Sequence, residues 1–236
     1  MSVTLLAPHT VRAASEPSCY SRLVNHWVCP SYWHDRGGEL RSALVQHLEI
    51  TVVAVALGMV VAIPLALLAR RLGWLRQGVL GLTTALYTVP SLALFPLLVP
   101  FTGLTMTTVV IGLAVYALTI LVRAVVDGLD AVPPDVRDAA DGLGYGPVRR
   151  LARIELPLAV PVILAGLRVA TVSTVALTTV GSLVAYGGLG NLIADGVRTD
   201  FRAELLSAAV LCVVLAVVLD IVLVLAGRAV TGWRRA

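Results

Sequence analysis

The sequence contains no lysine, although its 236 residues include 18 basic side chains, all of them arginines. A phosphate-binding loop of the Walker A type needs a lysine that reaches the β- and γ-phosphates, so this chain is predicted not to be an ATP-hydrolysing enzyme. Charged residues are also few, at 14% against about 25% in soluble domains, whereas 58% of the residues are hydrophobic. We therefore predict an integral membrane protein without a cofactor of its own.

Cysteine and histidine are scarce as well, with three cysteines and four histidines. Because no two cysteines have C-x-x-C spacing and the histidines are scattered through the first quarter of the chain, we predict no metal site. Cys19 and Cys29 lie in a tail predicted below to be extracytoplasmic, where they either form a disulfide or stay free. The N-terminus lacks the run of about 7 to 15 apolar residues found in signal peptides, so no cleaved leader is expected.

The sequence is rich in long hydrophobic runs. Five of them approach the roughly 20 residues that a helix needs to cross a bilayer. They cover residues 50–69, 79–99, 106–126, 158–180 and 205–226. We predict an all-α membrane protein in which residues 44–228 form a domain of about five transmembrane helices, between an N-terminal tail of residues 1–43 and a C-terminal tail of residues 229–236.

Arginines gather in alternate loops between these runs. The three sets are Arg70, Arg71 and Arg76 after the first run, Arg137, Arg149, Arg150 and Arg153 after the third, and Arg228, Arg234 and Arg235 after the fifth. By the positive-inside rule these segments are predicted to be cytosolic and the N-terminus external, although the N-terminal tail also carries four arginines. Because the arginines flank apolar runs and form no basic stripe, we predict no binding to nucleic acid.

The loop of residues 128–157 is too polar to span a membrane, but prolines and glycines divide it regularly. The dividing residues are Pro134, Gly144, Gly146, Pro147 and Pro157. Proline at a helix start and glycine at a helix end predict a helix from Pro134 to about Leu143, a left-handed turn at Gly144 and a second helix from Pro147. Leu156-Pro157 is expected to bend the chain into the fourth span. The two helices either contact a soluble partner or rest on anionic membrane lipid.

The spacing of residues in this loop follows a known signature. Asp138-Ala139-Ala140 is followed after three residues by Gly144, and after nine more by Ile154-Glu155-Leu156-Pro157. This pattern resembles the E-A-A, G, I-x-L-P loop of permease subunits of ABC-type importers, with Asp138 in place of the glutamate. In that family the loop docks into a groove of the ATPase subunit. The resemblance implies that the following residues couple the permease to the ATPase: Asp138, Ala139, Ala140, Gly144, Ile154, Leu156 and Pro157.

The resemblance extends over roughly residues 44–227. Residues 87–93, 156–168 and 187–190 are similar to the osmoprotectant branch, which imports glycine betaine, choline, carnitine or proline betaine. The resemblance implies a type I importer in a prokaryotic cytoplasmic membrane. The implied partners are ATPase subunits carrying ATP and Mg²⁺, a second permease subunit, identical or different, and an extracytoplasmic substrate-binding protein. Import of another small solute, such as an amino acid or ergothioneine, stays open, as does a membrane anchor that recruits a partner without transport.

Prolines interrupt the second hydrophobic run. Because Pro90 and Pro96 remove backbone hydrogen bonds, the helix there is predicted to kink or break and to face protein or a water-filled cavity. Residues that could line a translocation pathway or gate at this point are Tyr87, Thr88, Pro90 and Ser91. The alternative is a packing kink without contact to substrate.

Two charged residues lie within later hydrophobic runs, Arg168 in the fourth and Asp220 in the fifth. Charges inside a membrane are costly and usually paired, so we predict an ion pair between them that joins the two helices.

A glycine-rich stretch, Gly187, Gly188 and Gly190, lies between the fourth and fifth runs. Because no lysine accompanies it, we expect a tight turn on the outer side and not a phosphate-binding loop. The segment that follows, residues 191–201, either meets a substrate-binding protein or forms a plain extracellular helix.

Overall fold

The computed structural model describes residues 18–21 and 23–232. In this part of the chain every regular element is a helix. The elements are α1 (Pro30–Asp35), α2 (Gly37–Arg71), α3 (Gly73–Thr88), α4 (Ser91–Thr102), α5 (Met106–Asp130), α6 (Pro134–Gly142), α7 (Pro147–Arg150), the π-helical turn η1 (Leu151–Glu155), α8 (Leu156–Thr178), the 3₁₀-helix η2 (Thr179–Val184), α9 (Leu189–Arg198) and α10 (Arg202–Val230). The predicted absence of a leader, and the arginines at positions 12, 22, 234 and 235, concern residues outside the described ones.

The five hydrophobic runs of the sequence correspond to four long helices and one bent pair of helices. Among the described residues, four helical segments are long and apolar enough to cross a membrane, and they cover residues 37–71, 106–130, 147–184 and 202–230. The fifth is the pair α3 and α4, which meet at an angle of 97°. The all-α prediction is therefore confirmed for the described residues, and the second predicted crossing is the bent pair, which forms either a broken span or a re-entrant loop.

The bend in the second crossing lies at Val89 and Pro90, as the proline pattern predicted. Val89 is extended, with φ −63° and ψ 125°, and α4 begins directly after Pro90. Pro96 was expected to contribute to the kink, but it lies inside α4 without ending the helix. A proline inside a helix removes one backbone hydrogen bond, and α4 keeps its helical backbone through Pro96 despite this loss.

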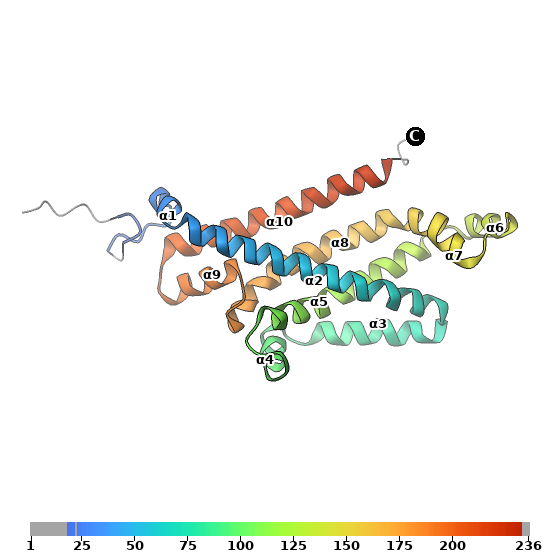
Figure 1. Cartoon of the computed structure of the whole chain (residues 1–236), viewed down its shortest axis with the longest axis horizontal. Coiled ribbons are helices and arrows are strands. Elements are labelled where there is room, and N and C mark those ends of the chain that lie inside the picture. The colour runs from blue at the N-terminus through green and yellow to red at the C-terminus, as the bar shows by residue number, and fades with distance from the viewer. Residues whose placement is uncertain (1–17, 22, 233–236) are drawn as a thin grey trace, which may run out of the picture.

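The long helices α2, α5, α8 and α10 run side by side along the molecule (Figure 1). The connection between α2 and α3 lies at the same end as α6 and α7, which we call the arginine-rich end because Arg70, Arg76 and Arg150 lie there. Helices α1 and α9 lie at the opposite end. The chain thus places its most polar segment, residues 128–157, at one extremity of an elongated bundle.

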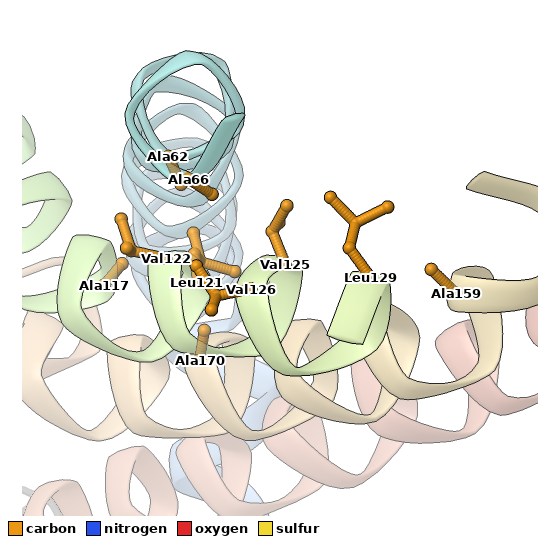
Figure 2. Packing of buried hydrophobic residues seen from close by; sticks show 10 residues of the cluster. All are labelled: Ala62, Ala66, Ala117, Leu121, Val122, Val125, Val126, Leu129, Ala159 and Ala170. Carbon is orange, nitrogen blue, oxygen red and sulfur yellow. The ribbon is translucent and has the colours of Figure 1, made fainter. Parts of the chain in front are cut away.

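The core is built around α5, which packs between α2 and α8 (Figure 2). Leu121, Val122 and Val125 of α5 are completely or almost completely buried against small residues, namely Ala62 and Ala66 of α2 and Ala159 and Ala170 of α8. Small side chains let helix backbones approach closely, and in a membrane this van der Waals packing is a main source of helix association. The alanine-rich faces of α2 and α8 therefore determine how closely α5 is held.

The fourth crossing begins earlier than the sequence indicated. We expected Leu156-Pro157 to bend the chain, but α7, η1, α8 and η2 form one continuous helical segment of 38 residues, from Pro147 to Val184. The amide of Leu156 donates a hydrogen bond to the Leu151 carbonyl, five residues earlier, so the helix passes into Pro157 through a wider π turn. Pro157 has no amide hydrogen to donate, and the wider π turn accommodates it without ending the helix.

A disulfide between Cys19 and Cys29 closes the described part of the N-terminal tail. Next to it, the rings of Tyr20, Tyr32 and Phe201 pack together, with Tyr32 and Phe201 edge to face at a centroid distance of 5.4 Å. Because Phe201 directly precedes α10, the tail is attached to the start of the last helix. The alternative of two free cysteines does not apply.

Candidate functional site

The candidate coupling segment, residues 128–157, contains two short helices joined at a glycine corner. Helix α6 begins at Pro134 with Asp135 in its first turn, where a negative charge complements the helix dipole. Gly144 follows α6 with φ +78°, a left-handed conformation that glycine adopts without strain. The amide of Tyr145 donates to the Ala140 carbonyl at 3.1 Å and closes the end of the helix. The predicted turn at Gly144 is therefore present.

The coupling residues divide into an exposed set and an anchored set. Asp138, Ala139 and Gly144 are exposed, and Pro157 is also exposed on the flank of α8. Ala140 is buried, and Ile154 and Leu156 are half-buried, with Leu156 packed against the core around α5. The first half of the signature therefore faces outward, whereas Ile154 and Leu156 attach the segment to the bundle.

Two apolar side chains widen the exposed set. Leu143, directly before Gly144, is 78% exposed, and Val148, four residues after Gly144, is 80% exposed. We call the surface of Asp138, Ala139, Leu143, Gly144 and Val148 the coupling surface. Exposed apolar groups rimmed by polar ones are typical of surfaces that bind another protein. The sequence pattern did not single out Leu143 or Val148, because an apolar residue at the end or the start of a short helix is equally consistent with core packing.

A network of charges lies beneath this surface, and the sequence analysis did not predict it. Glu155 is only 1% exposed, and its carboxylate accepts hydrogen bonds from Arg70 and Arg150, the latter from Nε at 2.8 Å. Arg150 also donates to Asp141 of α6. The sequence suggested only a topological role for Arg70 and Arg150, and the glutamate at the variable position of the I-x-L-P motif was the one available signal.

The break between α3 and α4 is stabilised from α5. The hydroxyl of Tyr116 donates to the Val89 carbonyl, which the break leaves without a helical partner, and the ring of Tyr116 packs edge to face on Tyr87. Thr88 donates to the Ala85 carbonyl at 2.7 Å. Tyr87, Thr88 and Pro90 are exposed and Ser91 is half-buried on the surface of the single chain. The four predicted pathway residues thus lie together at the break, with Tyr116 as an additional member that their sequence positions did not suggest.

Arg168 of α8 and Asp220 of α10 lie in contact. Arg168 donates two hydrogen bonds to the Asp220 carboxylate, from Nε at 2.7 Å and from Nη2 at 2.8 Å. The side chains are 41% and 31% exposed, so the pair lies at the edge of the interface between the two helices. A bidentate pair of this kind is strong and directional. It joins two helices whose sequence positions are 52 residues apart.

The glycine-rich stretch forms a turn in which neighbouring backbone atoms leave no room for side chains. Gly188 has φ +55°, and a Cβ atom there would lie 2.6 to 2.7 Å from atoms of His47 in α2. A Cβ atom on Gly190 would lie 2.3 Å from the carbonyl oxygen of Thr179. The amide of Gly187 donates to Asn191 Oδ1 at 3.0 Å. The turn therefore serves close packing of α9 against η2 and α2.

The opposite end of the bundle has a polar recess beside α9. A cavity of about 480 Å³ is lined by three carboxylates, those of Glu39, Asp195 and Glu204. Arg36 pairs with Glu39 at 3.2 Å and Arg198 with Asp195 at 3.7 Å. Nowhere among residues 18–21 and 23–232 do three His, Cys, Asp or Glu side chains form a group suited to a metal ion. Helix α9 accounts for most of the segment 191–201.

Comparisons with known proteins agree with this architecture. Residues 54–235 match the sequence model of a family described as binding-protein-dependent transport system inner membrane component. The chain is 36% identical over 195 residues to the osmoprotectant import permease protein OsmW of Salmonella typhimurium (strain LT2), covering 80% of this chain and 90% of that protein. It is 32% identical to the choline transport system permease protein OpuBB of Bacillus subtilis (strain 168), covering 83% and 90%.

A third relative is the ergothioneine transport permease/ergothioneine binding protein EgtU of Helicobacter pylori (strain G27), which is 37% identical over 145 residues, 61% of this chain and 26% of that protein. Among solved structures, an inward-facing structure of the MetNI methionine ABC transporter matches with a TM-score of 0.74 at 22% identity, over 81% of this chain and 96% of that one. An amino acid ABC transporter matches with a TM-score of 0.71 at 19% identity, over 86% and 99%.

The matched residues include the coupling segment and all the membrane-spanning helices apart from the first part of α2. The fold shared with MetNI and the identity to permease proteins confirm the predicted type of protein. The chain belongs to the family of binding-protein-dependent transport system inner membrane components, the membrane-spanning permease subunits of ABC importers.

Proposed function

We propose that this chain is the permease subunit of an ATP-driven importer for an osmoprotectant such as glycine betaine, choline or carnitine. The observation that carries the proposal is the 36% identity to an osmoprotectant import permease over 90% of that protein's length. ATP and Mg²⁺ are held by separate ATPase subunits, since the chain has no lysine for a Walker A loop. A second permease subunit, identical or different, completes the pore, and an extracytoplasmic binding protein delivers the solute.

The arginine-rich end faces the cytosol in this proposal. It contains the coupling segment and the connection between α2 and α3, and α10 also runs toward it (Figure 1). The positive-inside rule supports this orientation, because arginine is enriched in loops that stay in the cytosol. The disulfide between Cys19 and Cys29 supports the same orientation, because disulfides persist in oxidising compartments and α1 lies at the other end.

The coupling surface is the site at which ATPase closure acts on the permease. Its apolar side chains, Leu143 and Val148, fill a groove on the ATPase, and Asp138 provides a charge at the rim. Helix α7 continues through η1 into α8 and η2, so displacement at Pro147 is transmitted to the membrane-spanning part of one 38-residue helical segment. A push on the segment thereby tilts α8 and changes access to the pore from one side to the other.

The experiment that tests this function is reconstitution of the permease into vesicles with its ATPase and its binding protein. We expect ATP-dependent uptake of radiolabelled glycine betaine, choline or carnitine that requires all the partner chains. Ergothioneine is the appropriate competitor, given the similarity to EgtU. ATPase binding without uptake of any solute would contradict the proposal and indicate a membrane anchor.

Substitution of Gly144 with valine is expected to uncouple uptake from ATP hydrolysis. A β-branched residue with φ +78° is strained by about 1 to 2 kcal/mol, so the corner between α6 and α7 must change its geometry. A Cβ atom at this position meets no neighbour within 4 Å, so the bundle itself should stay folded. The measurement is solute transported per ATP hydrolysed, which should fall at least several-fold.

Two matched variants control this prediction. Gly142→Val adds the same side chain two residues earlier, where the backbone is helical and no neighbour lies within 4 Å, and it should keep coupling near normal. Gly144→Asn should also keep most of the coupling, because asparagine tolerates the left-handed conformation. Unchanged uptake by Gly144→Val would mean that the corner does not transmit the motion.

A further inference from the structure

A buried carboxylate lies where the coupling segment joins the membrane-spanning helices. Glu155 is in η1, is 1% exposed and accepts hydrogen bonds on both oxygens. Arg70, from the last turn of α2, donates to Oε2, and Arg150 of α7 donates to Oε1 from Nε at 2.8 Å. A buried charge is costly unless it is paired and hydrogen-bonded, so the position of Glu155 depends on both guanidinium groups.

The ion pairs continue on both sides of Glu155. On one side, Arg150 also donates to Asp141, which lies in the exposed helix α6. On the other side, Arg70 Nε lies 3.9 Å from Asp130 at the end of α5, and Asp130 is paired at 2.6 Å with Arg76 of α3. The charges alternate in sign along this series. It runs from the coupling segment through η1 to the ends of α2, α5 and α3.

Few apolar contacts hold the short helices α6 and α7 of the coupling segment against the rest of the bundle. Only Ala140 of α6 is buried, and α7 has no buried residue. Arg137 adds one hydrogen bond, from Nη2 to the Leu129 carbonyl at 2.8 Å. Elements with few buried apolar contacts open or shift at low free-energy cost. The charged series therefore provides a side-chain connection between α6 and the body of the bundle, to which α7 is already joined as the start of the continuous helix.

The π turn η1 contains Glu155, the residue at which the two branches of the ion-pair series meet. Its Leu156 amide bonds to the Leu151 carbonyl, and Glu155 is its last residue. Single π turns inside long helices are rare and occur frequently at functional positions. The helix therefore departs from α-helical geometry at Glu155, whose carboxylate accepts hydrogen bonds from both arginines.

We propose that Glu155 is a positioning residue for energy coupling, which fastens the coupling segment to α2 through Arg70 and to α6 through Arg150 and Asp141. This inference rests on the proposed importer function. A push at the coupling surface then moves α8 and α2 as one body, and is not absorbed by rotation of α6 relative to the helix that begins at Pro147. Glu155 touches neither solute nor nucleotide in this role.

The test uses the complete importer in vesicles, with glycine betaine as the probe and uptake per ATP hydrolysed as the readout. Glu155→Gln keeps the shape and the hydrogen-bonding oxygen but removes the charge. We expect uptake per ATP to fall about tenfold while ATP hydrolysis continues, a loss typical of coupling between linked sites. Asp127→Asn is the matched control, since Asp127 is exposed at the same end of α5 and forms no ion pair among the described residues; its ratio should be unchanged.

One further variant keeps the test informative if the Glu155→Gln protein does not fold, and a double variant tests whether Glu155 and Arg70 act as a unit. Asp141→Asn removes the half-exposed end of the series and leaves Glu155 paired with both arginines, so uptake per ATP should fall about threefold with folding intact. The double variant Glu155→Gln/Arg70→Gln should be no worse than either single variant, because contacting residues act as a unit. Independent, multiplying losses would overturn the proposal.

The remaining outcomes are also decisive. A normal uptake-to-ATP ratio in Glu155→Gln or Asp141→Asn would overturn the positioning role, even though the unmodified importer transports. Absence of uptake of glycine betaine, choline and carnitine by the unmodified importer would instead contradict the proposed function, and this result is obtained before any variant is made.

Discussion

Asp220→Arg is expected to prevent accumulation of folded protein in the membrane. Arg168 loses both of its hydrogen-bond acceptors, at 2.7 and 2.8 Å, and faces a second positive charge on α10. An arginine without a partner near the centre of a bilayer costs about 3 kcal/mol, and this variant contains two. A loss of this size is comparable with the total stability of many domains. The measurement is the amount of full-length protein in the membrane fraction and its thermal unfolding in detergent.

Exchanging the two charges distinguishes loss of the Arg168–Asp220 ion pair from a general intolerance of substitution at these positions. The double variant Arg168→Asp/Asp220→Arg restores opposite charges on α8 and α10 and should recover most of the folded protein. Asp220→Asn keeps an acceptor oxygen and should have a smaller effect than Asp220→Arg. A double variant no better than Asp220→Arg would show that the contact does not hold the two helices together.

Gly190→Ala is expected to lower the free energy of unfolding by about 3 kcal/mol or more. The added Cβ would lie 2.3 and 2.4 Å from the carbonyl oxygen and Cα of Thr179. These are backbone atoms, so no change of rotamer relieves the overlap, and α9 must move away from η2. Thermal unfolding in detergent measures the effect, and loss of uptake should accompany it because α9 forms part of the outer end.

Gly142→Ala is the matched control for this substitution. The same methyl group is added inside α6, where no atom lies within 4 Å. Alanine is favoured over glycine in a helix by about 0.5 to 1 kcal/mol, so stability should stay the same or rise slightly. Equal unfolding temperatures for Gly190→Ala and the unmodified protein would show that the turn is looser than the packing against Thr179 implies.

The coupling segment was largely predictable because its signals are local. Pro134 begins α6, and the predicted end near Leu143 lies one residue beyond the observed end at Gly142. Gly144 has the left-handed φ that its position after a helix predicted. Proline at a first turn and glycine after a last turn act within a few residues, so they need no information about the rest of the fold.

The fourth crossing shows where local reasoning fails. Leu156-Pro157 predicted a bend, yet the helix continues through a π turn at Leu151–Glu155. A proline near a helix start is compatible with a bend and with a continuous helix. Glu155, the last residue of this π turn, is held by Arg70, a residue 85 positions away in the sequence, and no local pattern predicts that contact.

The sequence by itself determined that the chain spans a membrane, contains five long apolar runs with a break at Pro90, and lacks a lysine for nucleotide chemistry. These properties follow from the free energy of transferring short apolar segments into a membrane and from the backbone preferences of single residues such as proline. Only the tertiary structure decided which charges meet Glu155, how Tyr116 satisfies the Val89 carbonyl, and why Gly190 must be glycine. Such contacts join residues far apart in the chain, and their formation depends on how α2, α5 and α8 pack.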